Sequence, residues 1–114
     1  MKALVGTLKV TASMANELLG YSDVGRDLAE ADRSAAWSSI GEQISAQGHG
    51  LTPATLTLEK AAIDEIIDWS MFEADMASID EHEDGLALAR FIRTMKSLAD
   101  RAHAAIANCK EVTR

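Results

Sequence analysis

Two pairs of carboxylates stand three residues apart in the chain, a spacing that suits a shared divalent cation. Asp27 and Glu30 form the first pair, and Glu65 and Asp68 form the second. Residues at i and i+3 share one face of a helix, and carboxylate oxygens are the ligands that Mg²⁺ prefers. Two such pairs on facing helices could hold Mg²⁺ against the phosphates of a nucleotide. The competing interpretation, which we favour, is that all four are solvated side chains.

In these residues the chain is similar to the all-α nucleoside triphosphate pyrophosphohydrolases of the MazG type. That family carries an E-x-x-E pair and, one helix later, an E-x-x-D pair, which Glu65 and Asp68 match. The first pair departs from the family, because Asp27 stands where the family has glutamate, and the two pairs are further apart than usual. The resemblance covers eight residues. It implies an alternative function, Mg²⁺-dependent hydrolysis of a nucleotide, with Asp27, Glu30, Glu65 and Asp68 as metal ligands.

Two further groups of residues have the types, but not the full pattern, of metal sites. Residues 80–85 resemble the first half of an EF-hand loop, but His82 and Phe91 stand where oxygen ligands are needed. Asp100 and His103 share a helix face, whereas a di-iron bundle needs two such pairs and two more carboxylates. We therefore expect a solvated acidic turn, a half-buried structural histidine and no cofactor.

Charge is distributed unevenly along the chain. Residues 59–84 hold ten acids and one base, whereas residues 85–114 hold two acids and six bases. The favoured interpretation is internal: an acidic helix packs antiparallel to a basic helix with flanking ion pairs. The other interpretation is that the acidic helix forms a surface that binds a partner with a basic surface. The candidate partner-binding residues are Glu59, Asp64, Glu65, Asp68, Glu73 and Asp75.

Direct binding of nucleic acid is not expected from this distribution. A phosphate backbone requires a basic face, and the chain offers only the short strip of Arg90, Arg93 and Arg101.

Composition predicts that helices position these residues, because alanine, leucine, isoleucine and methionine dominate and aromatic residues are few. Turn signals at residues 20–23, 47–53 and 80–85 divide the chain into four segments. The predicted fold is all-α, a slender bundle of three long helices plus a shorter N-terminal helix. The four segments carry these helices in chain order.

The first segment, residues 3–19, has apolar residues at helical spacing, although residues 4–10 also alternate and leave a strand as the alternative. The second helix is expected over residues 23–46, with Ser22 or Asp23 as N-cap. The third is expected to begin near Pro53, which suits a first helical position.

The fourth segment has the clearest helical pattern. Its start is open, since a capping box at residues 78–81 competes with a break at Gly85. Apolar residues then follow with heptad spacing, which predicts a seam for self-association. The seam residues are Leu88, Ile92, Met95, Ala99, Ala102 and Ile106. Cys109 continues the seam, and a two-fold axis there would bring it near Cys109 of a second copy.

Length, charge and cysteine count limit the class of protein. The 114 residues fit a single domain over residues 1–114, with a formal net charge of −7. One cysteine cannot form an internal disulfide, and no apolar run approaches the roughly 18 residues of a membrane span. A cytoplasmic, homo-oligomeric, protein-binding module is therefore expected: an adaptor, assembly chaperone or inhibitor without catalytic residues.

Overall fold

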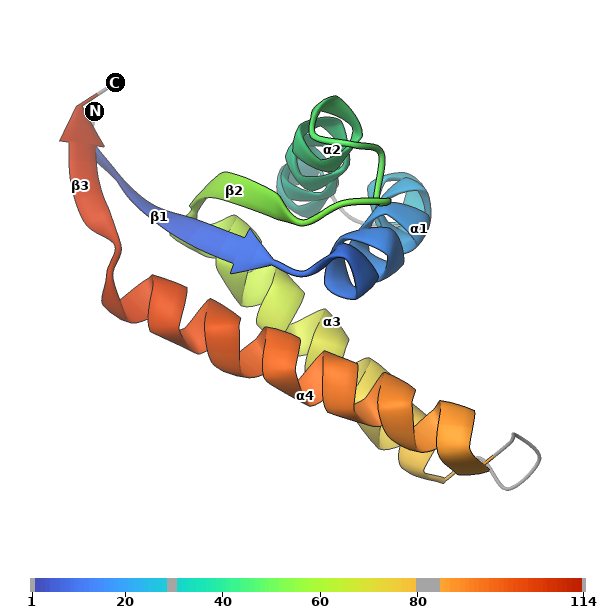
Figure 1. The fold of residues 1–114 in the computed structure, drawn as a ribbon. Helices are drawn as coiled ribbons and strands as arrows, with labels where there is room; N and C mark the ends of the chain where they lie inside the picture. The colour runs from blue at the N-terminus through green and yellow to red at the C-terminus, as the bar shows by residue number, and fades with distance from the viewer. Residues whose placement is uncertain (1, 29–30, 80–84, 114) are drawn as a thin grey trace.

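The computed structural model describes residues 2–28, 31–79 and 85–113, which form four helices and a small sheet (Figure 1). Along the chain the elements are β1 (Lys2–Val10), α1 (Ala12–Leu28), α2 (Ala31–Ala46), β2 (Ala54–Glu59), α3 (Lys60–Ser78), α4 (Gly85–Ala107) and β3 (Lys110–Thr113).

The predicted all-α bundle is wrong, because three strands form an antiparallel sheet. β1 occupies the segment where the first helix was expected, and the alternative strand is the correct one. Leu8 and Val10 are buried while Thr7 and Lys9 are exposed, the alternation of a strand with one face on a core. Leucines four residues apart satisfy a helical period and a strand period equally, so this short segment was ambiguous.

The third predicted helix begins seven residues later than expected, at Lys60 instead of Pro53. Ala54, Leu56 and Leu58 are buried with exposed threonines between them, so this stretch forms β2. Threonine is β-branched and favours a strand over the first turn of a helix.

β1 is the central strand of the sheet, whose order is β2-β1-β3. Residues 5–10 of β1 pair with β2, and residues 2–5 pair with β3, both antiparallel. Beyond Val5, the side of β1 that faces away from β2 therefore has no strand beside it in the described ranges.

Two glutamines of α2 cover the outer edge of β2. Gln43 donates from Nε2 to the carbonyl of Thr57 at 2.9 Å, and its Oε1 accepts from the Thr57 N–H at 2.8 Å. Gln47 makes the same two bonds to Thr55, each at 2.8 Å. An antiparallel strand directs both backbone groups of a residue to one side. The backbone N–H and C=O groups of Thr55 and Thr57 thus point toward α2, and those of Leu56, which lies between them, point toward β1.

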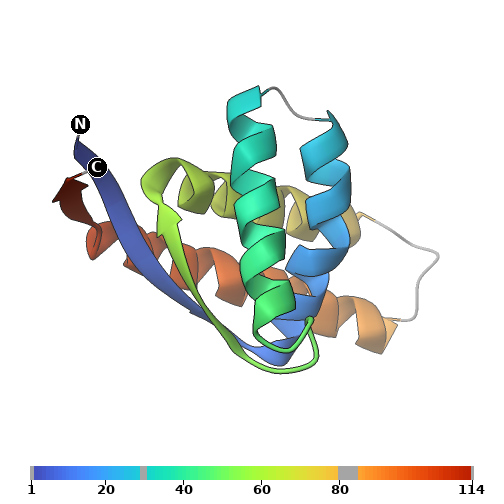
Figure 2. The ribbon, with the colours of Figure 1, turned by 90° about the horizontal axis from the view of Figure 1, so that it is seen from above.

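The helices form two antiparallel pairs, and Figure 2 shows α1 and α2 lying across α3 and α4. The expected turn at residues 20–23 lies inside α1, and the predicted second helix corresponds to the end of α1 plus α2. Ser22 is buried, and its hydroxyl donates to the Leu19 carbonyl at 2.8 Å, so it does not cap a helix. A Cβ on Gly41 would lie 2.7 Å from the Ser22 Oγ, which explains how closely α2 approaches α1.

An aromatic cluster joins the two helix pairs. Tyr21 of α1 contacts Trp37 of α2 and Trp69 of α3, with ring centroids 4.8 and 5.1 Å away. The Trp69 Nε1 is buried without a hydrogen-bond partner among the described residues. The cluster fixes α3 against the first pair, while the far end of the α3–α4 pair extends past it (Figure 1).

Candidate partner-binding surface

The six predicted partner-binding carboxylates do not form one surface. Glu59 ends β2 and directly precedes α3. Asp64 pairs with Lys60 at 2.9 Å within α3, and Glu65 pairs with Arg33 of α2 at 2.6 Å. The carboxylates at the start of α3 are therefore engaged within the molecule.

Glu73 faces α1 and is only partly exposed. It lies near Glu17, whose pKa is raised first by burial and then by the negative charge of Glu73. Both side chains are partly buried, so Glu73 is less accessible to a partner than the exposed Asp68 and Asp75.

The remaining two carboxylates, Asp68 and Asp75, lie on the outward face of α3 beside exposed apolar side chains. Phe72 lies four residues after Asp68 and three before Asp75, so the three side chains share one face of the helix. The exposed fraction of the Phe72 side chain is 59%. Met76 and Ile79 extend this face and are 48% and 70% exposed. We call Asp68, Phe72, Asp75, Met76 and Ile79 the outer α3 face. An apolar row beside acids on one helix face is the pattern of a recognition surface.

Sequence reasoning missed the apolar part of this face. Phe72 follows the buried Trp69 by three residues, a spacing that is also typical of two side chains on one apolar helix face. Ala74 is buried, and Phe72 lies two residues, about 200°, from it around the helix. A separate outward apolar row was therefore detectable from the phase of the pattern.

The heptad seam of α4 lies against this chain's own α3. Met95, Ala99 and Ala102 are buried in the core, and Leu88, Ile92 and Ile106 are partly buried beside it. Residues already buried in one chain are not available to a second copy. Three of the six seam residues are thus occupied within the chain, and self-association stays a prediction. Cys109 lies beyond α4, partly buried close to Gly6 of β1.

The structure gives the magnesium hypothesis no support. Glu30 lies outside the described residues. At the end of α1, the Asp27 Oδ1 lies 3.7 Å from the Arg26 Nε. Glu65 forms an ion pair with Arg33 of α2. Among described residues, no group of three or more His, Cys, Asp or Glu side chains could hold a metal ion. The pyrophosphohydrolase stays a prediction from sequence.

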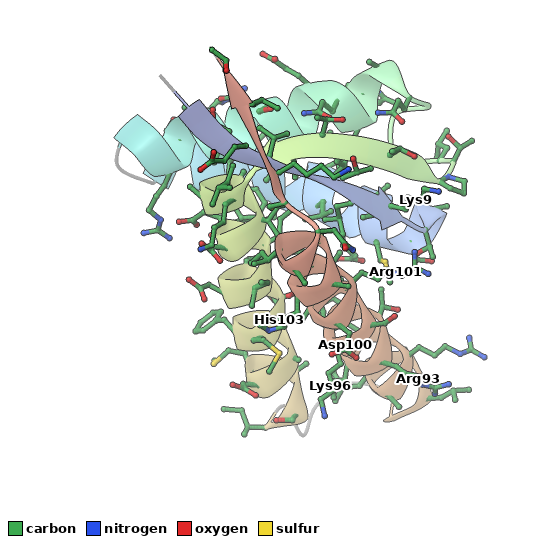
Figure 3. The ribbon with its side chains drawn as sticks, turned by 90° about the vertical axis from the view of Figure 1, so that its left-hand side faces the viewer. Lys9, Arg93, Lys96, Asp100, Arg101 and His103 are labelled. Atoms are coloured by element: carbon green, nitrogen blue, oxygen red, sulfur yellow. The ribbon has the colours of Figure 1, made fainter. Side chains whose placement is uncertain are left out.

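The two other candidate metal sites also lack support. Of the EF-hand-like stretch, residues 80–84 lie outside the described ranges. His103 is exposed on α4, not half-buried as predicted. Figure 3 shows it with Asp100 on a side of the molecule that also carries Lys9, Arg93, Lys96 and Arg101.

The expected ion pairs between an acidic and a basic helix are absent from the described part of the chain. Asp64 and Glu65 form their ion pairs with residues of α3 and α2, and Arg93 and Lys96 of α4 pair with no carboxylate in the described ranges. The α3–α4 contact is apolar, through alanines and other side chains of the seam. Asp68 and Asp75 of α3 and Arg93 and Lys96 of α4 thus have no ion-pair partner in the described ranges.

Comparison with protein-family models, curated proteins and solved structures gave no match. None of the helices in the described ranges combines the length and apolar character that crossing a membrane requires. The candidate site therefore rests on the geometry of the outer α3 face.

Proposed function

We propose that the protein is a small cytoplasmic protein-binding module, an adaptor, assembly chaperone or inhibitor, that recognises a basic protein segment through the outer α3 face. The observation that supports this is the exposure of Phe72, Met76 and Ile79 in one row beside Asp68 and Asp75. Large apolar side chains in a row are costly to leave in water, and aromatic residues often anchor interfaces.

The charges around the row indicate the chemistry of the partner. Asp68 and Asp75 make no ion pair with the described residues, and the chain carries a net charge of −7. A partner with apolar side chains flanked by lysine or arginine would bury the row and pair with both carboxylates. An amphipathic basic helix has this pattern. Charge attraction would speed the encounter and weaken as salt screens it.

The test captures the partner and then measures the purified pair. A photoreactive amino acid replaces Met76 in the full chain, and the cross-linked protein is identified by mass spectrometry. The Kd of the reconstituted pair is then compared for wild type, Phe72→Ala and Asp68→Asn plus Asp75→Asn. We expect each variant to weaken binding about tenfold or more.

Matched controls use residues away from α3. Leu51→Ala removes an apolar side chain that is 82% exposed, and Glu42→Gln removes an exposed charge. Neither control should change the Kd. A captured partner that binds every α3 variant as tightly as wild type would overturn the proposal.

A further inference from the structure

A groove of about 770 Å³ lies between β1 and the C-terminal end of α4. Residues 5–9 of β1 form one wall, and Arg101, Ala104, Ala107 and Asn108 contribute to the other. Because the alanine side chains are small, α4 leaves space for the groove beside β1. The volume falls within the range of about 300–1,000 Å³ that is usual for ligand pockets.

The groove is positively charged, although the protein is acidic. Lys9, Arg101 and Lys110 line it, and the lining includes no Asp or Glu. None of the three makes an ion pair with the described residues. Three cations around one concave surface, in a chain of net charge −7, attract a negatively charged ligand.

The wall formed by β1 offers unpaired backbone groups. Because alternate residues of β2 face β1, the register directs the backbone of Gly6 and Leu8 toward β2 and that of Thr7 and Lys9 toward the groove. The hydrogen bond from Arg101 Nη1 to the Lys9 carbonyl, 2.9 Å long, agrees with this direction. The N–H groups of Thr7 and Lys9 and the carbonyl of Thr7 have no hydrogen-bond partner in the described chain.

The outer edge of β2 and the open side of β1 differ in how fully their backbone groups are hydrogen-bonded. Gln43 and Gln47 satisfy the outer edge of β2 with paired amide bonds, whereas one arginine satisfies one carbonyl on the open side of β1. An uncovered strand edge is a template for another strand. The open segment is short and flanked by cations, so it selects for an acidic chain.

We propose that an acidic peptide segment of a partner binds in this groove in extended conformation and adds a strand beside Thr7 and Lys9. Main-chain hydrogen bonds to β1 supply affinity, and carboxylates of the peptide pair with Lys9, Arg101 and Lys110. Arg101 keeps further N–H donors, which suit a bidentate bond to a carboxylate. This surface is separate from the outer α3 face and prefers the opposite charge.

The register sets the spacing of the acidic residues. Lys110 pairs with Val5, so Lys110 and Lys9 stand four strand positions apart on the same face of the sheet, a distance of about 13 Å. A peptide with acids at its first, third and fifth positions spans them. The probe is therefore acetyl-Glu-Val-Glu-Val-Glu-amide, with its glutamine counterpart as the uncharged control.

The experiment is an NMR titration of the ¹⁵N-labelled full chain. We expect the acidic peptide to shift the amide signals of Thr7 and Lys9 and to protect them from hydrogen exchange, with little effect of the glutamine peptide. Lys9→Gln plus Lys110→Gln should weaken binding about tenfold or more, and Arg93→Gln on the exposed part of α4 should not. Phe72→Ala should also leave it unchanged, which separates this site from the outer α3 face.

A second variant tests the strand itself. Thr7→Pro removes an N–H that faces the open side, where proline is tolerated, and should abolish peptide binding while circular dichroism remains native. Inorganic phosphate is titrated in parallel. Shifts with phosphate but not with the peptide, or equal peptide binding by the Thr7→Pro variant, would overturn the proposal, as would the absence of any shift.

Discussion

Gly6 is a position at which even one added methyl group should disturb the fold. A Cβ there would lie 2.8 Å from the Cys109 Sγ and 2.9 Å from the Ala105 carbonyl oxygen. We expect Gly6→Ala to lower the free energy of unfolding by about 1–3 kcal/mol, because overpacking moves α4 away from β1.

The control for this prediction is Gly20→Ala in α1, where a Cβ has no atom within 4 Å. Alanine there should raise the stability by about 0.5–1 kcal/mol, since glycine is a poor helix former. Urea denaturation measures both variants. Equal stability of Gly6→Ala and wild type would show that the contact between β1 and α4 is looser than described.

Glu17 makes a pH-dependent contribution to stability. Its pKa is raised in the folded protein, by burial and then by Glu73, so its ionised form is less favourable in the folded than in the unfolded chain. The penalty is absent below the ordinary glutamate pKa and develops as the pH rises through the raised value. We expect Glu17→Gln to stabilise the protein at neutral pH and to have no effect in acid.

Thermal melts across this pH range measure the difference, with Glu42→Gln on the exposed side of α2 as the control. A Glu17→Gln benefit that persisted below the ordinary glutamate pKa would assign it to packing instead of charge.

Sequence reasoning found the candidate carboxylates but not their surroundings. Asp64 and Glu65 are indistinguishable from Asp68 by type and spacing, yet the first two form ion pairs and the third does not. The Glu65 pair depends on Arg33, which is 32 positions away in sequence. Such partners follow from the tertiary fold and could not be read from the helix alone.

At the scale of elements, the amide bonds from α2 to β2 should contribute measurable stability. Gln47→Ala removes two hydrogen bonds to β2, and Gln43→Ala removes two to β2 and one to the Ser39 hydroxyl. We expect a loss of about 1–2 kcal/mol per variant. Glu42→Ala on the same helix is the control. The double variant should also increase light scattering, because it uncovers the edge of β2.

A second comparison identifies the cause. Gln43→Glu keeps an acceptor for the Thr57 N–H but loses the donor to its carbonyl, and should therefore be intermediate. Stability equal to wild type in all three glutamine variants would contradict the role assigned to these bonds.

The helical elements were predicted better than the strands. The heptad of α4 has seven-residue periodicity over many turns, which short-range preferences could not mimic. β1 and β2 are short, and their pairing joins residues about fifty positions apart. No local signal in either strand specifies its partner, so the sheet emerged only from the three-dimensional arrangement.

For the molecule as a whole, the outer α3 face predicts how self-association depends on salt. Two copies that met through Phe72 would bring Asp68 and Asp75 of both chains together, and these like charges repel. We expect the mass in solution to stay near 12.2 kDa at low salt and to rise as salt is added.

Sedimentation equilibrium measures this dependence. Asp68→Asn plus Asp75→Asn should allow association at low salt, and Phe72→Asp should prevent it at any salt. Association that weakens as salt increases would point to an interface between the acidic and the basic side instead.

The glutamine pair of α2 has a geometric consequence. Four residues of helix advance about 6.0 Å, and two residues of strand advance about 6.6 Å, so the two repeats are nearly commensurate. Two side chains can therefore follow alternate residues of β2, and the mismatch is absorbed by the flexible glutamine arms. Each further pair would add about 0.6 Å of error, and each step of four residues rotates the side chain by about 40° around the helix axis, so a third side chain would point away from the strand. A helix can act as a substitute strand, but only over the length of a strand as short as β2.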